Sequence, residues 1–168
     1  MSSSDRPVLQ TSDLVGLTRD PLVDGRQSDK ALAIQRGVCR MFMDMGLSPF
    51  SEFTLATGRR ADVIAISDKG DIWIVEIKSS LADFRSDSKW HEYLDYCDRF
   101  LFAVDADFPV EVLPDDVGYM MADRYGAEIV RPPTESRLIT ARRKAVTVRF
   151  AWQLARRMQL ILDPEAAL

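Results

Sequence analysis

Two apolar segments near the middle of the chain flank a short polar stretch, and this pattern predicts a β-hairpin. Residues 63–66 and 72–77 are rich in β-branched side chains, which favour extended strands. Residues 67–70, of sequence SDKG, have the composition of a tight turn. The charged residues that interrupt the apolar pattern lie at the end of the hairpin away from the turn: Asp62, Glu76 and Lys78.

The turn also determines which residues of the two strands lie opposite one another. If the turn is a three-residue loop that ends with its glycine in the left-handed conformation, Ile66 lies opposite Ile72. The same register places Asp62 opposite Glu76, with Cβ atoms about 5 Å apart. Two carboxylates this close repel each other, so the pairing predicts a cation between them, either a divalent ion or the Lys78 ammonium group. The simpler alternative is an ordinary salt bridge between Lys78 and one acid.

Apolar residues elsewhere in the chain recur at helical or strand spacing. Helical periodicity predicts a first helix over residues 28–45, with Ser28 as its N-cap, and a second helical region over residues 81–98. An amphipathic C-terminal helix is predicted to begin just after Lys144. Further strands are predicted over residues 49–56, 99–104, 117–122 and 127–130. The resulting order, helix-strand-strand-strand-helix-strand, predicts an α/β fold.

The length and composition of the chain indicate one globular domain. Its 168 residues suit a single domain over residues 28–168, preceded by a tail or arm over residues 1–27. No apolar run approaches the roughly 20 residues that a membrane span requires, and the N-terminus lacks the apolar core of a signal peptide. Two cysteines, Cys39 and Cys97, do not make a disulfide framework. We therefore expect a cytoplasmic protein with no membrane partner and no small-molecule cofactor.

The charge of the chain is distributed unevenly. The formal net charge is −4, from 22 basic and 26 acidic residues. Residues 136–162 contain seven basic residues and no acid, so the rest of the chain holds 15 basic residues against the 26 acids. This asymmetry points to a basic surface on the C-terminal helix, which the net charge alone would hide.

At 100° per residue the C-terminal helix has an apolar and a basic side. The apolar side is formed by Val148, Ala151, Trp152, Leu154, Ala155, Met158 and Leu162. The basic side is formed by Arg142, Arg143, Arg149, Arg156 and Arg157. A row of arginines without acids predicts a phosphate-binding surface for DNA. The alternatives are a solubilising face or one that pairs with acids elsewhere in the chain.

The hairpin and its surroundings resemble a known group of nucleases. Asp62 followed by Glu76-Ile77-Lys78 resembles the PD-(D/E)XK nuclease signature on its second and third strands. The longer stretches GRRADVIAI and WIVEIKSSLADFRSDSKWHEYLDYCDRFLFAV resemble the bacterial MmcB-like DNA repair family, over about residues 29–157. The resemblance implies a restriction-endonuclease-like α-β-β-β-α-β core, with a mixed central sheet flanked by helices, in a protein of the bacterial cytoplasm associated with the nucleoid.

The resemblance also implies a metal-dependent site. Mg²⁺ or Mn²⁺ would be held by the carboxylates of Asp62 and Glu76 and the backbone carbonyl of Ile77, since these ions favour hard oxygen ligands. Lys78 would orient or help to deprotonate a bound water and stabilise the negative charge that develops. Ser79, directly after this lysine, is a further candidate for supporting the site.

One feature departs from the nuclease pattern. Nucleases of this fold often carry a third acid on the first helix, but no acid lies on the inward face of residues 28–45. Gln35, at the edge of that face, could replace it through its amide oxygen or remain an ordinary polar residue. Glu52 could also supply the missing acid, but we expect it to face solvent instead.

Several residues near the hairpin are candidates for contacting DNA. Arg59 and Arg60 precede Asp62. They could bind phosphate, or they could belong to a solvated turn. Lys89 and Tyr93 have the spacing of a Gln-x-x-x-Tyr element found in some relatives of the fold. Lys89 could contact phosphate, and Tyr93 could contact a sugar or base or simply pack in the core.

The leading hypothesis is a metal-dependent DNA endonuclease or related repair nuclease that hydrolyses phosphodiester bonds. The alternative is a protein that binds a DNA structure or a repair partner on a nuclease fold without cutting. A weaker third reading is a structural protein whose arginine helix meets its own acidic residues or a second subunit. A homodimer is possible in each case, but the sequence shows no apolar stripe that establishes one.

Overall fold

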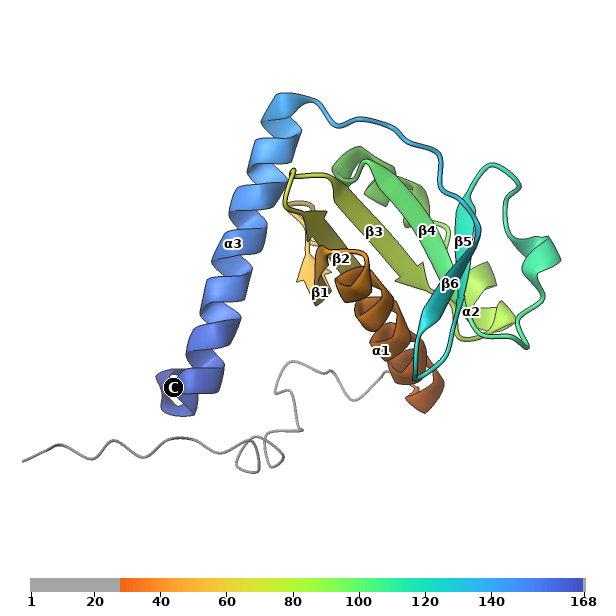
Figure 1. The fold of residues 1–168 in the computed structure, drawn as a ribbon, viewed down its shortest axis with the longest axis horizontal. Coiled ribbons are helices and arrows are strands. Elements are labelled where there is room, and N and C mark those ends of the chain that lie inside the picture. Colours follow the sequence, from red (N-terminus) through yellow and green to blue (C-terminus); the bar gives the residue numbers. More distant parts are fainter. Residues whose placement is uncertain (1–27, 168) are drawn as a thin grey trace, which may run out of the picture.

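A computed structural model describes residues 28–167, which form a six-stranded sheet with helices on both faces (Figure 1). Across the sheet the strands follow chain order: β1 (Leu47–Thr54), β2 (Arg60–Ser67), β3 (Ile72–Ile77), β4 (Arg99–Val104), β5 (Gly118–Ala122) and β6 (Ala127–Arg131). The α-helices are α1 (Asp29–Asp44), α2 (Leu81–Ser86) and α3 (Thr140–Leu162). Short 3-10 helices are η2 (Trp90–Tyr96), η3 (Val110–Val112) and η4 (Pro164–Ala167).

The sheet is mixed, as predicted. Strand β2 is antiparallel to both β1 and β3, whereas β3, β4 and β5 run parallel to one another and β6 is antiparallel to β5. The predicted α/β class, with an α-β-β-β-α-β order and a C-terminal helix, is therefore confirmed. The predicted tail, residues 1–27, lies outside the described residues.

Two apolar layers hold the sheet between its helices. On one face, Ile34, Val38 and Phe42 of α1 pack in a layer that includes Val63 and Val75. The other face carries the opposite set of strand side chains, because neighbouring residues of a strand point to opposite faces. This second layer includes Ile64, Ile74, Phe100, Trp90, Tyr93, Val146 and Phe150, so η2 and α3 cover that face.

The central hairpin has the predicted register. Ile66 pairs with Ile72, and the ladder continues to Val63 and Val75. Gly70 adopts a φ of 84°, the left-handed conformation that a three-residue turn needs and that glycine adopts without steric cost. Extending this register by one residue places Asp62 opposite Glu76.

The predicted helix over residues 81–98 is wrong as one element. It is divided into α2, which Ser80 caps through a hydrogen bond from Asp83 N, and the 3-10 helix η2. The division falls at Asp87, whose backbone is extended and whose carboxylate accepts hydrogen bonds from Lys89 N and Lys78 Nζ. A side chain that bonds nearby backbone groups competes with the helix, so Asp87 ends α2.

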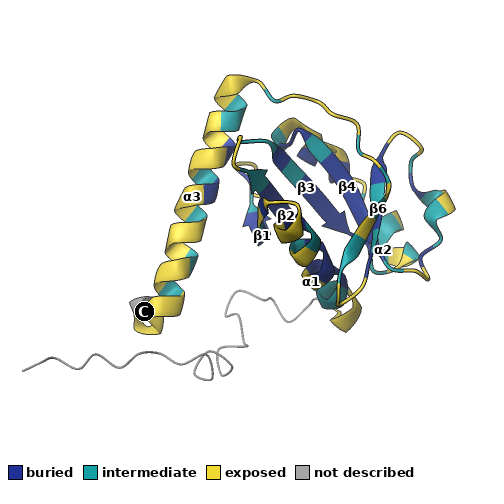
Figure 2. Ribbon diagram, in the orientation of Figure 1, coloured by how far each residue is buried: buried dark blue, intermediate teal, exposed yellow. Residues whose placement is uncertain are grey.

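The C-terminal helix starts earlier than predicted and faces the other way. It begins at Thr140, before Lys144, and only Val146 and Phe150 are buried along the α3 range. Figure 2 shows α3 as a largely exposed helix beside the sheet. The apolar side predicted from the sequence points to solvent, with Trp152 57% exposed, while several arginines of the basic side contact the protein. None of the helices in residues 28–167 is long and apolar enough to cross a membrane.

Candidate functional site

Strands β2 and β3 bring Asp62, Glu76 and Lys78 together on the sheet face that η2 covers. Asp62 is half-buried, and its Oδ2 accepts a hydrogen bond of 2.7 Å from the backbone N–H of Ile77. Glu76 is buried, and its Oε2 has no hydrogen-bond partner among the described residues. A buried carboxylate oxygen without a partner is costly, so this position suits a cation.

Burial and mutual repulsion favour the neutral form of both acids. Burial is the main cause that raises the pKa of Asp62 to about 7, and the charge of Glu52 raises it further. Burial also raises the pKa of Glu76 well above its usual value, and the neighbouring Asp62 adds to this shift. At both acids, burial and the charge of neighbouring carboxylates outweigh the attraction of Lys78, which lowers each pKa.

Lys78 supplies part of the missing positive charge but is shared with another acid. Its side chain is 3% exposed, and its Nζ lies 2.5 Å from Asp87 Oδ2 and 3.6 Å from Glu76 Oε1. Burial alone would lower the pKa of Lys78, but Glu76 and the hydrogen bond to Asp87 offset this, so the pKa is raised. Asp87 was not among the residues predicted for the site, because no local pattern distinguishes it from the neighbouring acids Asp83 and Glu92.

Glu52 occupies a special position on β1. The paired residues on either side, Ser51 with Val63 and Phe53 with Ala61, leave Glu52 opposite Asp62. Together with the β2–β3 register, this produces a row of three acids across neighbouring strands: Glu52, Asp62 and Glu76. The expectation that Glu52 faces solvent is wrong, since the residue is buried.

The backbone and the neighbours of Glu52 set its direction. It adopts a φ of 57°, the left-handed region that is uncommon for residues other than glycine. Its Oε2 lies 2.7 Å from Arg60 Nε, and its charge contributes to the raised pKa of Asp62. Strained backbone conformations often accompany functional sites, and no periodicity in the sequence indicates this one.

The three acids do not converge on one point. Within residues 28–167 no group of three or more acids, histidines or cysteines is placed to hold a metal ion. The pair formed by Asp62 and Glu76 nevertheless fits a hard divalent ion, because such ions are commonly held by one or two carboxylates together with waters. The carboxylate oxygen of Glu76 that lacks a hydrogen bond is the observation that supports this fit.

The first helix does not bring Gln35 to this row. Gln35 is buried on α1, whose apolar neighbours pack in the layer of Val63 and Val75. Asp62 and Glu76 are one residue removed from these positions, so they project from the opposite face of the sheet. Gln35 and the acid pair are therefore on different sides of the sheet.

The remaining support candidates make local contacts. Ser79 donates through both N and Oγ to Asp83 Oδ2, at 3.1 and 3.4 Å. Tyr93 is buried, and its hydroxyl donates to the backbone carbonyl of Arg60 at 3.0 Å, so it fixes the start of β2. Arg59 forms a two-pronged ion pair with Glu92.

Most of the predicted DNA-binding arginines of α3 contact the protein itself. Arg143 bonds Asp98 and the carbonyl of Gly70, while Arg149 and Arg157 donate to carbonyls of β1. Arg142 lies over the ring of Tyr96 at 4.5 Å. Arg156 is exposed and lies over the ring of Trp152 at 5.0 Å.

A groove between β1 and α3 lies beside the acid row. Its volume is about 370 Å³, and its lining includes Glu52, Arg60, Trp152, Arg156 and Arg157. Since Arg60 is bonded to Glu52, which lies opposite Asp62, the Arg60 guanidinium group connects the groove to the acid row. This placement suits the phosphates of a nucleic acid better than the arginine row expected from the sequence.

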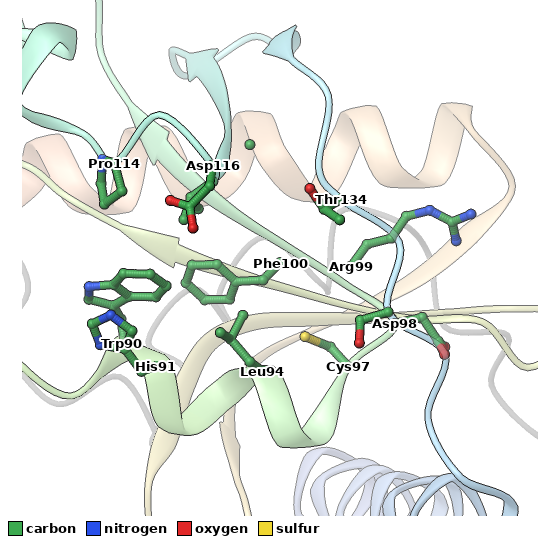
Figure 3. Close-up of a pocket in the computed structure, with 13 residues that line it drawn as sticks. Trp90, His91, Leu94, Cys97, Asp98, Arg99, Phe100, Pro114, Asp116 and Thr134 are labelled. Atoms are coloured by element: carbon green, nitrogen blue, oxygen red, sulfur yellow. The ribbon is translucent and has the colours of Figure 1, made fainter.

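A second pocket, of about 440 Å³, lies elsewhere (Figure 3). It is formed by η2, the start of β4 and the segment before β5, with Trp90, Phe100 and Pro114 among its walls. Asp98 lines it too, but this carboxylate is engaged by Arg143. The pocket therefore offers mainly apolar walls, and neither Asp62 nor Glu76 lines it.

Comparison with known proteins places the chain in a family. No curated protein matches it. A solved structure, described as the SPO1766 protein of unknown function from Silicibacter pomeroyi, is 45% identical, with a TM-score of 0.79 over 83% of this chain and 95% of that chain. The family described as DNA repair protein MmcB-like matches residues 18–165. The chain therefore belongs to the MmcB-like family of DNA repair proteins.

Proposed function

We propose that this protein is a metal-dependent DNA endonuclease of the PD-(D/E)XK type that acts in DNA repair. The observation that carries the proposal is the close pair of Asp62 and buried Glu76, with a carboxylate oxygen of Glu76 that has no hydrogen-bond partner within residues 28–167 and with Lys78 beside it. Family membership supports a role in DNA repair but leaves the reaction open.

The proposed ion is Mg²⁺, with Mn²⁺ as its substitute. Asp62 and Glu76 would hold it through their carboxylates, together with the backbone carbonyl of Ile77. When bound, a divalent ion lowers the pKa of a coordinated water and draws charge from a phosphate oxygen. Binding would require both acids to be ionised, and their raised pKa values mean that protons and metal compete for the pair.

The protonation state of Lys78 and its contact with Asp87 indicate what each residue would do in the proposed reaction. Because Asp87 and Glu76 keep its pKa raised, Lys78 remains an ammonium group at neutral pH. An ammonium cannot accept a proton, so Lys78 would orient the attacking water and stabilise negative charge on the phosphate rather than act as a base. Asp87 would act as a positioning residue, since it touches Lys78 and not the reacting atoms.

The DNA would approach along the groove between β1 and α3. Arg60 and Arg156 have exposed guanidinium groups at this groove, and Arg60 lies two residues before Asp62. Arginine binds phosphate oxygens through paired hydrogen bonds. We propose these two residues as the phosphate contacts nearest to the scissile bond, with Lys89 as a further candidate.

A second candidate function is DNA or partner binding without cleavage. It is supported by the missing acid on α1 and by the acid row, which does not converge on one point. Gln35→Glu tests this alternative. If the variant gained cleavage activity, the native protein would be a DNA-binding protein that lacks one metal-ligating acid. Because residue 35 lies on the opposite face of the sheet from Asp62 and Glu76, we expect no gain of activity.

Cleavage of a DNA panel tests the proposed function. Wild type, Asp62→Asn and the exposed control Glu128→Gln would be incubated with duplex, single-stranded, nicked, flapped and four-way DNA in Mg²⁺, Mn²⁺ or EDTA. We expect cleavage that requires metal and is lost in Asp62→Asn only. Binding without cleavage, unchanged in Asp62→Asn, would contradict the proposal and favour the second candidate.

A further inference from the structure

The outward side of α3 carries an apolar stripe that nothing in residues 28–167 covers. The exposed fractions are 60% for Val148, 57% for Trp152, 52% for Met158 and 73% for Leu162. In Figure 2 most of the length of α3 is coloured as exposed. Contiguous apolar surface of this kind marks an interaction site.

The spacing along this stripe is that of a helix-pairing surface. We define the α3 seam as these residues: Val148, Ala151, Ala155, Met158 and Leu162, with Trp152 at its border. The five seam positions follow at intervals of 3, 4, 3 and 4 residues, the heptad spacing with which one helix packs along another. Ala151 and Ala155 are also exposed, and two small residues in mid-seam allow a second helix backbone to approach closely.

Three arginines of α3 leave this surface open, because they are turned inward, whereas Arg156 is exposed and lies over the ring of Trp152 at the border of the seam. Arg143, Arg149 and Arg157 are bonded to Asp98, Thr54 O and Ser51 O on the side that faces the sheet. The helix therefore presents its basic side to the protein and its apolar side to water. An arrangement of this kind exposes apolar area at a free-energy cost unless a partner covers it.

We propose that the seam is a self-association surface, on which α3 of a second copy of this chain packs in the antiparallel direction. The argument for a second copy is charge complementarity between the two ends of α3. Lys144 lies four residues before Val148 and is exposed, while Asp163 and Glu165 follow the helix and are exposed. No acid occurs in residues 136–162, so α3 itself contains none, and the acids nearest to it in the sequence directly follow its C-terminal end.

Antiparallel pairing brings these opposite charges together. With the two-fold axis beside Gln153, Ala151 of one copy meets Ala155 of the other, and Val148 meets Met158. Lys144 then lies beside Leu162 and Asp163 of the second copy at each end of the seam. A parallel pair would instead place Lys144 beside its own counterpart, with like charges opposed.

The inference is independent of the proposed nuclease activity, because it concerns assembly in the absence of DNA and metal. Sedimentation equilibrium of the full chain over about 1–200 μM tests it. We expect a dimer whose dissociation constant rises at least about tenfold in Ala155→Glu, which buries a charge in the seam. Met43→Glu is the matched control, since Met43 is 68% exposed on α1, away from the seam; circular dichroism checks that each variant is folded.

A charge exchange tests the antiparallel direction. Lys144→Glu and Asp163→Lys should each weaken the dimer, and the double variant should recover most of the lost affinity. Recovery is expected only if the two positions meet across the interface. Failure of the double variant to recover would contradict the antiparallel arrangement.

Three other results would overturn the proposal. One is a protein that stays monomeric at every concentration. Another is a dimer that Ala155→Glu leaves intact, which would assign assembly to a different surface. The third is a monomer whose Trp152 fluorescence is shielded from acrylamide, which would mean that another part of the chain, such as residues 1–27, covers the seam.

Discussion

Lys78 Nζ lies 2.5 Å from Asp87 Oδ2 and 3.6 Å from Glu76 Oε1, so one buried ammonium group connects the acid pair to the end of α2. The shorter of the two contacts is with the residue that the PD-(D/E)XK signature does not contain. Asp87 is thereby the main hydrogen-bonding partner of the lysine in the proposed site. Its own pKa is lowered, because the bonds from Lys78 and Lys89 N offset the effect of burial.

Asp87→Asn should change the pH dependence of cleavage. Without the Asp87 charge the pKa of Lys78 falls, so the ammonium group is lost at lower pH. We expect a rate reduction of roughly tenfold at pH 8 and a high-pH limb of the pH–rate profile displaced to lower pH. Asp95→Asn, exposed on η2, is the control; a uniform loss at all pH values would show that Asp87 acts on folding alone.

Asp62→Asn should make the free energy of unfolding of the metal-free protein less sensitive to rising pH. The pKa of Asp62 is raised from 3.8 to about 7 in the folded state, so folding favours its protonated form. Stability is therefore lost as pH rises from about 4 to about 7. Asparagine cannot ionise, so urea unfolding in EDTA should show the variant gaining about 2 kcal/mol over wild type between pH 5 and pH 8. Parallel pH dependence of the two proteins would show that Asp62 titrates normally.

Divalent metal should stabilise the folded protein through the same acids. At 10 mM Mg²⁺ and pH 8, we expect the melting temperature of wild type to rise by at least about 2 °C, since a ligand that binds the folded state stabilises it. The rise should be smaller at pH 6, where protons compete for the acids. Glu76→Gln should abolish the rise and Glu128→Gln should preserve it. An equal rise in Glu76→Gln would mean that the ion binds elsewhere.

Asp98 should be among the residues whose loss destabilises the fold most. Its buried carboxylate accepts from Ile72 N, Leu138 N and both terminal nitrogens of Arg143, at 2.6–2.9 Å. Asp98→Ala removes the carboxylate that these donors share, although Arg143 Nη1 keeps the carbonyl of Gly70, and it should reduce the free energy of unfolding by about 3–5 kcal/mol.

Double-variant analysis and pH provide the checks on this effect. The double variant Asp98→Ala/Arg143→Ala should lose less free energy of unfolding than the two single variants lose in sum, because the two residues act as a pair. The pKa of Asp98 is lowered, since its hydrogen bonds from Arg143 and the backbone offset burial. Its contribution is therefore present at neutral pH and lost on acidification. Additive losses would show that the pair is not coupled.

The hairpin could be predicted in detail from the sequence, because its information is local. The turn composition set the position of Gly70, and strand alternation then set the pairing of Ile66 with Ile72. The candidate acid pair followed from the same register. The partners of Lys78 and Arg143 are acids nine and 45 residues away, and no local pattern identifies contacts over such separations.

The orientation of α3 could not be predicted for a different reason. Helical periodicity identifies which residues share a side of the helix, but not which side meets the sheet. Here β1 is an edge strand, and the carbonyls of Thr54 and Ser51 accept hydrogen bonds from Arg149 and Arg157. A guanidinium group satisfies such carbonyls as an apolar side chain cannot. The arginine side of the helix therefore docks, and the apolar side faces outward.

The anchors of α3 also imply an order of events during protein synthesis. The groups that accept hydrogen bonds from Arg143, Arg149 and Arg157 include Ser51 O, Thr54 O, Gly70 O and Asp98, and these four precede the helix in the chain. The strands and turns that contain these groups are synthesised before α3 leaves the ribosome. The helix can thus dock on a sheet that has already formed, so the side of α3 that faces the protein is determined by groups that are in place before the helix emerges.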